Sequence, residues 1–342
     1  MPTGEYLQYG GQAIIEGVMM RSPKYFSVAC RAPNGTIVLQ AEPLAKTWIG
    51  RQKWLKAPFL RGTLALLDAL ALGARAMSFS SAVQLEKVHQ SSAEGNDDAE
   101  RSIEGSEIVR PQAKGGGSLM KLAVVGTIIL SLGLGVLIFV ATPVWIAQLF
   151  TYIGVKSQFG LNVVEGVVKA AVFMGYLAAI GRMKDVQEVF KYHGAEHKAI
   201  NTLEAGQELI VENAAAQTRL HPRCGTSFAI IVLLVSIVLF TVLPRSYDTG
   251  SVTLDLFIRI GLKLLILPII AGIAYEAIRF AGKFRDQRWV MALFWPGLKS
   301  QLLTTREPEP RHIEVALVAL RSVLDLEAGK PTETQEPQAA IN

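Results

Sequence analysis

Four long apolar stretches dominate the pattern of hydrophobic and polar positions along this chain. They cover residues 122–150, 161–181, 227–244 and 256–278. Each is close to the ~20 helical residues that cross a hydrocarbon core of ~30 Å. The first and third include runs without any charged residue, at 124–140 and 228–243. The pattern therefore predicts a mainly α-helical membrane protein with about four transmembrane helices.

The second and fourth apolar stretches carry ionisable side chains, Glu165 with Lys169 and Arg259 with Lys263. A charge inside a bilayer is costly, so these side chains are expected to face protein, water or the lipid headgroups. Charges within membrane spans can also mark the path of a solute. Both interpretations remain open from the sequence.

Basic residues between the apolar stretches predict the orientation of the chain. The loop 182–226 is rich in Lys and Arg, whereas the loops 151–160 and 245–255 each carry a single basic residue. Short loops rich in Lys and Arg stay in the cytosol. An even number of spans then places both termini and the 182–226 loop together in the cytosol.

The polar segments predict a small cytosolic α+β domain built from the N-terminal region, the central loop and a C-terminal helix. In the region 1–47, two β-type runs flank Asn34-Gly35, a pair suited to a tight hairpin turn. Residues 48–87 read as an amphipathic segment that lies in the interface or packs on other helices. Membrane helices follow at 118–181 and 227–278, and the C-terminal segment 279–327 ends in an amphipathic helix. Residues 88–117 and 328–342 read as a flexible linker and a disordered tail.

Composition agrees with a membrane protein and narrows the functional classes. Half of the 342 residues are hydrophobic and 18% are charged, and the mean hydropathy is +0.32. The net charge of +5 comes from basic residues beside apolar runs, without the aromatic-studded basic stripe of a nucleic-acid binder. Cys30 and Cys224 are too far apart in sequence to form a disulfide framework, which favours a reduced compartment. The expected partner is the lipid bilayer, and no nucleic acid is expected.

The helix predicted at 183–205 carries the strongest chemical motif, His193-Gly-Ala-Glu196-His197. Gly206 suits the left-handed position that ends such a helix. Histidines at i and i+4 lie on one face and can bind one ion. Glu196 follows the inverted zincin order His-x-x-Glu-His, in which the carboxylate is the general base. The motif predicts a divalent transition metal site, with zinc as the expected ion.

A second cluster, His221-Pro-Arg223-Cys224-Gly, precedes the third span on the same predicted face. A catalytic zinc takes three protein ligands and keeps a fourth position for water. Either Cys224 or His221 would complete the set begun by the two helical histidines, whereas all four together would indicate a closed, structural site. The alternative is a hydrogen-bonded pair of core histidines without a metal.

Several other polar residues are candidates for a supporting role. The glycines at 10, 11 and 17 permit close approach of the backbone around Gln12, Glu16 and Arg21. Glu16 could bind a metal or act in acid–base chemistry, and an ion pair with Arg21 is the alternative. Arg223 adjoins Cys224, and Glu276 lies at the predicted cytosolic end of the fourth span.

Three motifs in order carry a resemblance to a known family: Gly10-Gly-Gln-Ala-Ile-Ile-Glu-Gly-Val-Met-Met-Arg21, Tyr192-His-Gly-Ala-Glu-His-Lys198 and His221-Pro-Arg-Cys-Gly-Thr-Ser-Phe228. The chain resembles the YqhQ-type family of bacterial membrane proteins over roughly residues 8–325, which implies a location in the bacterial inner (plasma) membrane. That family is a domain of unknown function described as predicted metal-dependent enzymes. The resemblance implicates His193, Glu196, His197, His221 and Cys224.

Two functions are compatible with these patterns. The first is a membrane-anchored hydrolase that uses a metal-activated water at the cytosolic membrane face, on a lipid-like substrate or on a peptide bond near the membrane. The second is a non-catalytic scaffold or transporter in which a structural metal or a buried His pair organises the cytosolic part.

Overall fold

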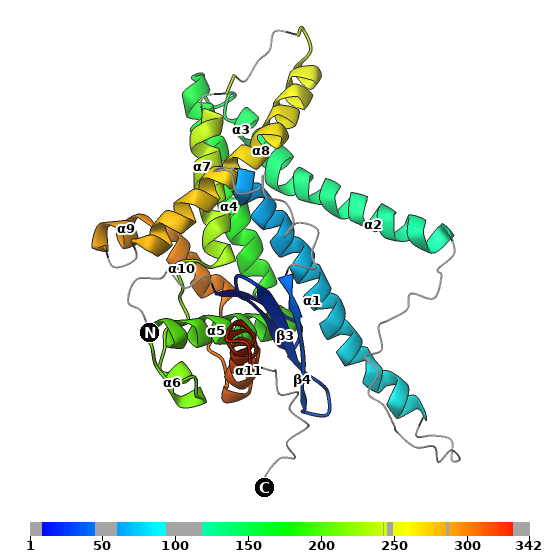
Figure 1. The fold of residues 1–342 in the computed structure, drawn as a ribbon. Helices are drawn as coiled ribbons and strands as arrows, with labels where there is room; N and C mark the ends of the chain where they lie inside the picture. Colours follow the sequence, from blue (N-terminus) through cyan, green and yellow to red (C-terminus); the bar gives the residue numbers. More distant parts are fainter. Residues whose placement is uncertain are drawn as a thin grey trace.

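The computed structural model describes residues 9–44, 60–93, 118–241, 243–244, 249–284 and 287–330. It is mainly helical, with a small antiparallel sheet near the N-terminus (Figure 1). The strands are β1 (Gly10–Ile14), β2 (Gly17–Arg21), β3 (Tyr25–Arg31) and β4 (Ile37–Pro43), and they lie in the order β1-β2-β3-β4. This confirms the predicted fold class, a helical membrane protein with a small α+β part.

The sheet is a meander in which each strand forms an antiparallel hairpin with the next. The turn predicted at Asn34-Gly35 joins β3 to β4, and Gly35 adopts a φ of +90° there. The hairpin of β1 and β2 has a two-residue turn in which Glu16 has a φ of +50°. The sequence indicated only a glycine-rich turn at this place. Alternating side chains are not obvious in Gly10-Gly-Gln-Ala, so the pattern hid the first strand.

The sheet is packed between two helical layers. Val18, Met20 and Ala29 face helix α5 (Lys184–Glu204) and helix α11 (Pro310–Glu327), whose apolar side chains complete one core. The opposite face packs on helix α1 (Leu60–Ala93) through Leu72 and Ala76. Helix α11 is the predicted C-terminal amphipathic helix, and it lies on the sheet as expected.

The remaining helices are mostly apolar. They are α2 (Ser118–Val136), the π-turn η4 (Leu137–Ala141), α3 (Thr142–Leu149), α4 (Gln158–Ile180), α7 (Gly225–Thr241) and α8 (Val252–Lys283). Short helices α6 (Val211–Ala215), α9 (Arg288–Leu293) and α10 (Trp295–Thr304) complete the described part of the chain.

Four stretches are long and apolar enough to cross a membrane, namely 65–85, 129–149, 158–180 and 253–283. The last three match predicted spans, whereas the stretch 65–85 belongs to α1. Helix α7, the predicted third span, is apolar but has only 17 residues. It nevertheless packs with α4 and α8, since Gly166 of α4 contacts Ile237, and Ile231 shares an apolar cluster with Ala274. The chain is therefore a multi-pass membrane protein.

Helix α1 connects the apolar bundle to the sheet. Near its start, Gly62 lies against Gly272 and Tyr275 of α8. Further along, Ser80 donates a hydrogen bond to the Ile15 carbonyl, and Gln84 donates one to the Arg31 carbonyl at 2.8 Å. The second half of α1 is thus covered by the sheet, in line with the alternative that segment 48–87 packs on other elements. Residues 48–59 lie outside the described part.

Other predicted segments are only partly described. Helix α1 continues to Ala93, six residues into the predicted linker 88–117, and α2 begins at Ser118 where that linker ends. Residues 94–117 lie outside the described part, as do residues 331–342 of the predicted tail.

The charged residues within the predicted spans gather inside the helical bundle. Glu165, Lys169, Arg259 and Lys263 are all at least nine-tenths buried. Glu165 accepts hydrogen bonds from Arg259 and Lys263, and Arg259 also donates to Asn162 Oδ1 at 2.9 Å. The cluster lies in the first halves of α4 and α8, away from the end of α4 that leads into α5. These charges face protein, as one of the two sequence interpretations expected.

Candidate metal centre

Helix α5 presents the His-x-x-Glu-His motif to the interior. The helix begins after Met183 and ends before Gly206, which has the predicted left-handed φ, here +67°. Gly194 inside the motif has a packing function: a Cβ atom there would lie 2.3 Å from the carbonyl oxygen of Arg306. The segment that follows α10 crosses the helix at this point, with the Arg306 N–H donating to the Phe190 carbonyl at 2.9 Å.

The second half of the site is the turn that leads into α7. Buried Gln301 of α10 holds this turn by its backbone, because its Oε1 accepts from the His221 N–H at 2.9 Å and its Nε2 donates to the His221 carbonyl at 2.7 Å. Cys224 immediately precedes α7, and the Thr226 N–H lies 3.4 Å from the Cys224 sulfur. The cysteine therefore sits at the positive end of the helix dipole.

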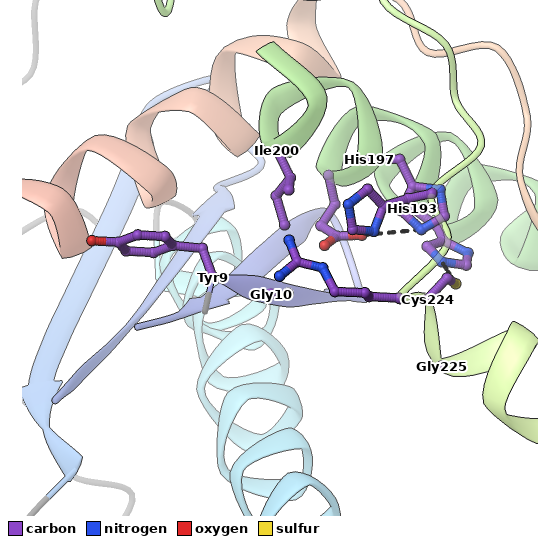
Figure 2. A pocket seen from close by; sticks show the side chains of 11 residues that line it. Tyr9, Gly10, His193, His197, Ile200, Cys224 and Gly225 are labelled. Carbon is purple, nitrogen blue, oxygen red and sulfur yellow. Dashed lines mark hydrogen bonds and ion pairs between the residues drawn. The ribbon is translucent and has the colours of Figure 1, made fainter. Parts of the chain in front are cut away.

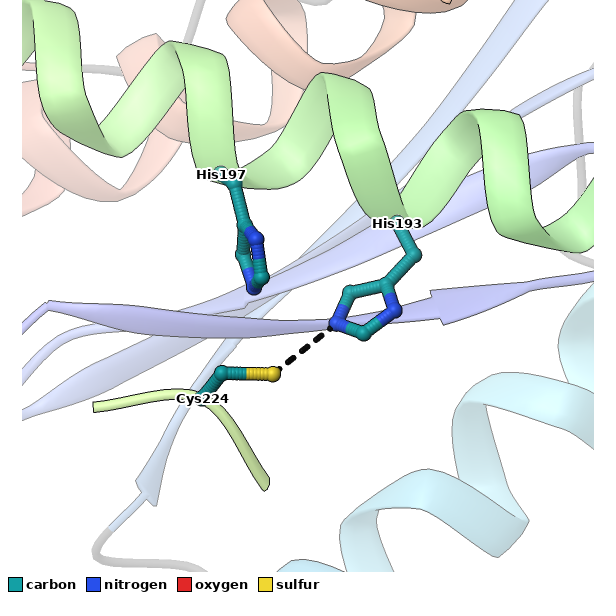
Figure 3. A group of neighbouring side chains, drawn as sticks. All are labelled: His193, His197 and Cys224. Atoms are coloured by element: carbon teal, nitrogen blue, oxygen red, sulfur yellow. Dashed lines mark hydrogen bonds between the residues drawn. The ribbon is translucent and has the colours of Figure 1, made fainter. Parts of the chain in front are cut away.

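Three potential ligands converge where these elements meet (Figure 3). One ligand atom each from His193, His197 and Cys224 all lie within 4.8 Å of one another. His193 Nε2 is 3.1 Å from the Cys224 sulfur. The two imidazole rings contact edge to face, with centroids 4.5 Å apart. Of the two residues that the sequence left open as the third ligand, the structure groups Cys224 with the helical pair.

Backbone carbonyls orient both imidazoles for binding through Nε2. Nδ1 of His193 lies 2.8 Å from the Thr304 carbonyl oxygen, and Nδ1 of His197 lies 2.6 Å from that of Arg219. A carbonyl only accepts, so each Nδ1 carries a proton, and the lone pair of the neutral imidazole, the form that binds a metal, is then on Nε2. Nε2 of His197 is buried and has no hydrogen-bond partner among the described residues. The donor set and this orphaned nitrogen fit a metal ion.

The electrostatics of the cluster favour a thiolate. Burial alone would raise the pKa of the Cys224 thiol, but the adjacent His193 and His197 outweigh it and hold that pKa well below its usual range. Burial likewise opposes protonation of His197, yet Cys224 and Glu196 raise its pKa to about 9. A thiolate is the form in which cysteine binds a metal.

Glu196 lines a pocket together with the three ligands. Figure 2 shows this pocket, with His193, His197 and Cys224 on one side of it. Its carboxylate oxygen Oε2 is 3.5 Å from His197 Nε2, and the side chain is buried. Strand β1 covers it closely, because a Cβ atom on Gly11 would lie 2.6 Å from Glu196 Cγ. The pocket is lined by residues from β1, α5 and the turn before α7, namely Tyr9, Gly10, Gly11, His193, Glu196, His197, Ile200, His221, Arg223, Cys224 and Gly225.

His221 lines the same pocket without joining the ligand group. Its ring centroid is 5.8 Å from that of His197, and its Nε2 is 3.5 Å from Oε2 of Glu204. Glu204 also accepts a hydrogen bond from Arg223. The supporting candidate Arg223 is thus at the pocket, held by an acidic residue at the end of α5.

The other supporting candidates lie away from the ligands. Gln12 packs on α1, where a Cβ atom on Gly73 would meet its side-chain amide, and Arg21 pairs with Asp68 of α1 at 2.7 Å. Glu16 accepts a hydrogen bond from the Tyr192 hydroxyl at 3.1 Å. The expected alternative partner of Glu16, Arg21, pairs elsewhere. Glu276 is half-buried on α8 and is not among the pocket residues.

Several residues of the site escaped the sequence analysis. The carbonyls of Thr304 and Arg219 that orient the histidines, and Gln301 that holds the turn, carry no motif. A carbonyl orients a ring whatever its own side chain is, so only the fold reveals it. Tyr9 adjoins the glycine pair, and that proximity was the only available signal.

Comparison with known proteins places this architecture in a family. The family described as a protein of unknown function, DUF1385, matches residues 57–326. The chain belongs to the DUF1385 family. It is similar to the uncharacterized protein YqhQ of Bacillus subtilis (strain 168), with 33% identity over 328 residues that cover 94% of this chain and 93% of that protein. No solved structure matches the chain. The resemblance read from the three motifs is thereby confirmed, and the motifs at 192–198 and 221–228 lie within the residues that the family matches.

Proposed function

We propose that this protein is a membrane-anchored zinc hydrolase in which His193, His197 and Cys224 hold the metal and Glu196 is the general base. The observation that carries the proposal is the convergence of the three ligand atoms within 4.8 Å. Two of these ligands are already oriented by carbonyls through their Nδ1 atoms. Nitrogen and thiolate donors suit zinc better than they suit magnesium or calcium.

Three protein ligands are the number found in catalytic zinc sites, where the fourth position is open. A zinc ion at such a site lowers the pKa of a water molecule and polarises a substrate carbonyl. His221 is not needed as a ligand in this arrangement. It lines the pocket beside His197 and is placed to contact the substrate.

Glu196 is the residue that distinguishes a hydrolase from a structural metal site. Its carboxylate is buried at the pocket next to the ligands. Among the residues that the structure describes, no side chain donates a hydrogen bond that would hold it as a purely structural group. As general base it would take a proton from the attacking water and pass it to the leaving group. Strand β1, packed on its Cγ, would keep the carboxylate in place.

The proposed orientation puts the metal centre on the cytosolic side. Helix α4 ends at Ile180 and α5 starts at Lys184, and Cys224 directly precedes α7, so the centre adjoins the membrane helices at one end. The basic loop 182–226 favours the cytosol for this end. A membrane-impermeant thiol reagent on whole cells should label Ser157→Cys, between α3 and α4, and spare Glu208→Cys. Labelling of Glu208→Cys alone would reverse the orientation.

The hydrolase proposal is tested by separating metal binding from function. Purified wild type and Glu196→Gln should each contain about one zinc per chain, whereas His193→Ala and His197→Ala should lose it. In cells that lack the protein, Glu196→Gln should fail to restore function although it is folded and zinc-loaded. Full restoration by Glu196→Gln would contradict a hydrolase and leave a structural metal.

A second candidate is a transporter or scaffold in which the metal organises the cytosolic part. It is supported by the buried cluster of Glu165, Arg259 and Lys263 between α4 and α8. This candidate predicts that Lys169→Met abolishes function in cells while Glu196→Gln preserves it. The hydrolase predicts the reverse.

A further inference from the structure

Strand β1 is an edge strand, and its outer side carries main-chain groups that pair with nothing in the described structure. In the sheet order β1-β2-β3-β4, β1 has a neighbour only on one side. Ile14 and Gly17 close its two-residue hairpin turn. Ladder hydrogen bonds alternate along antiparallel strands, so Gln12 pairs toward β2 while the N–H and C=O groups of Gly11 and Ala13 point outward. No hydrogen bond to these outward groups occurs among the described residues.

The opposite edge of the sheet supports this assignment of directions. On β4, the same alternation turns the main-chain nitrogens of Ala41 and Pro43 outward. Proline has no N–H to donate and is tolerated at such positions of an edge strand. The presence of Pro43 there is consistent with the alternation. Ala41 on β4 therefore corresponds to Ala13 on β1, because the main-chain N–H of each points away from the sheet.

The free edge of β1 borders the metal centre. Gly10 and Gly11 are the residues through which the sheet lines the pocket, and no residue of β2, β3 or β4 takes part. Gly11 and Gln12 are exposed, although the Cα of Gly11 lies against Glu196. Figure 2 shows the strand at Gly10 passing the histidines and Cys224. An extended chain added to this edge would therefore run beside Glu196 and the three ligands.

We propose that the substrate is a peptide segment, bound in extended conformation as an additional strand on the outer edge of β1. Unpaired N–H and C=O groups in alternation match the main chain of an extended peptide, a mode of recognition used at other sheet edges. A lipid has no such regular series of donors and acceptors. The proposal deepens the hydrolase proposal and rests on it for the cleavage step, but not for binding. It makes the protein a peptidase that acts close to the membrane surface.

The docking is tested on the full chain in nanodiscs with a pool of random octapeptides carrying an N-terminal fluorescein. Ala13→Pro removes the outward N–H of β1 and places a ring on that edge. Ala41→Pro makes the same change on the opposite edge and is the matched control. Loss of the hydrogen bond and of close pairing should weaken binding of the pool by about tenfold or more in Ala13→Pro. Ala41→Pro should bind like wild type.

Two further arms keep the test decisive. The same peptides N-methylated at every residue have no main-chain N–H left to donate to the edge and should not bind wild type, which tests the proposal even if Ala13→Pro fails to fold. Wild type freed of metal with a chelator should bind the unmodified pool as the zinc-loaded protein does, because docking needs the edge and not the metal. If the zinc-free protein still binds the peptides, the docking proposal holds even when the hydrolase proposal fails.

Other results would overturn the proposal. Equal binding by wild type and Ala13→Pro would do so, as would the absence of peptide binding. Disulfide-linked dimers of Ala13→Cys in the absence of peptide would show that a second copy occupies the edge. If fluorescent phosphatidylglycerol binds in the pocket and neither peptide pool displaces it, the pocket binds a lipid and not a peptide.

Discussion

Gly11 of β1 lies against Glu196 of α5 so closely that a Cβ atom on Gly11 would come within 2.6 Å of Glu196 Cγ and 2.9 Å of Oε1. The sheet and the motif helix thus meet at the carboxylate proposed as the general base. Only glycine fits this contact. The glycine pair near the N-terminus thus contacts the His-x-x-Glu-His motif, which lies roughly 180 residues later in the chain.

Substituting Gly11 should disturb this contact specifically. Gly11→Ala must displace either the strand or Glu196, and overpacking of this kind costs about 1–3 kcal/mol. We expect a lower unfolding midpoint in detergent and loss of function in cells. Gly10→Ala is the matched control, because nothing lies within 4 Å of a Cβ atom there. Equal midpoints for the two variants would contradict the close contact.

Gly194 should respond in the opposite sense to an ordinary helical glycine. Alanine in place of a helical glycine normally stabilises by about 1 kcal/mol. At Gly194 the new Cβ would meet the Arg306 carbonyl oxygen at 2.3 Å, so Gly194→Ala should lower the unfolding midpoint and weaken zinc binding. Gly175→Ala in α4, where the space is open, should not lower it. A stabilised Gly194→Ala variant would show that the 306 segment does not cross α5 as described.

The two cysteines should differ in their reaction with a small alkylating reagent. Burial and the nearby Glu16 raise the pKa of Cys30 to about 12, so its thiol stays protonated and unreactive in the folded protein. The pKa of Cys224 is lowered, chiefly by His193 against the effect of burial. In chelator-treated protein, Cys224 should therefore react even near pH ~6, where an ordinary thiol is protonated.

Zinc should protect Cys224 from this reaction, and mass spectrometry of the modified peptides checks both sites. Cys224→Ala supplies the control in which no modification is expected in the folded state. Equal labelling of Cys224 with and without zinc would remove it from the ligand set.

The buried charges of the bundle should matter for stability. Glu165→Gln takes the carboxylate away from Arg259 and Lys263, which are both buried. Breaking a buried ion pair by removing one partner costs about 3–5 kcal/mol. We expect a clear drop in the thermal unfolding temperature in detergent, whereas Glu208→Gln, an exposed position, should leave it unchanged. If the two variants unfold alike, the cluster does not hold α4 to α8.

The sequence was most informative where one periodic pattern decides a local structure. Helix α5 begins and ends within a residue or so of its prediction, because the apolar stripe and Gly206 act locally. The β3–β4 hairpin was predicted for the same reason, from Asn34-Gly35. The third ligand was not decided, because whether Cys224 or His221 faces the helix depends on Gln301, some 80 residues further along.

Long-range packing explains the remaining differences. Helix α1 looked like an interfacial segment because its composition mixes apolar and charged residues, and the sheet that covers its second half is not visible in a local window. Arg21 appeared available to Glu16, which lies five residues earlier, yet it pairs with Asp68 on α1. Sequence proximity cannot reveal such partners.

The central claim is a zinc ion held by His193, His197 and Cys224, and zinc X-ray absorption on the purified protein tests it most directly. The account predicts a shell with one sulfur at about 2.3 Å and nitrogen neighbours at about 2.0–2.1 Å, with the sulfur absent in Cys224→Ser. A metal-free wild type, or a shell without sulfur, would contradict it.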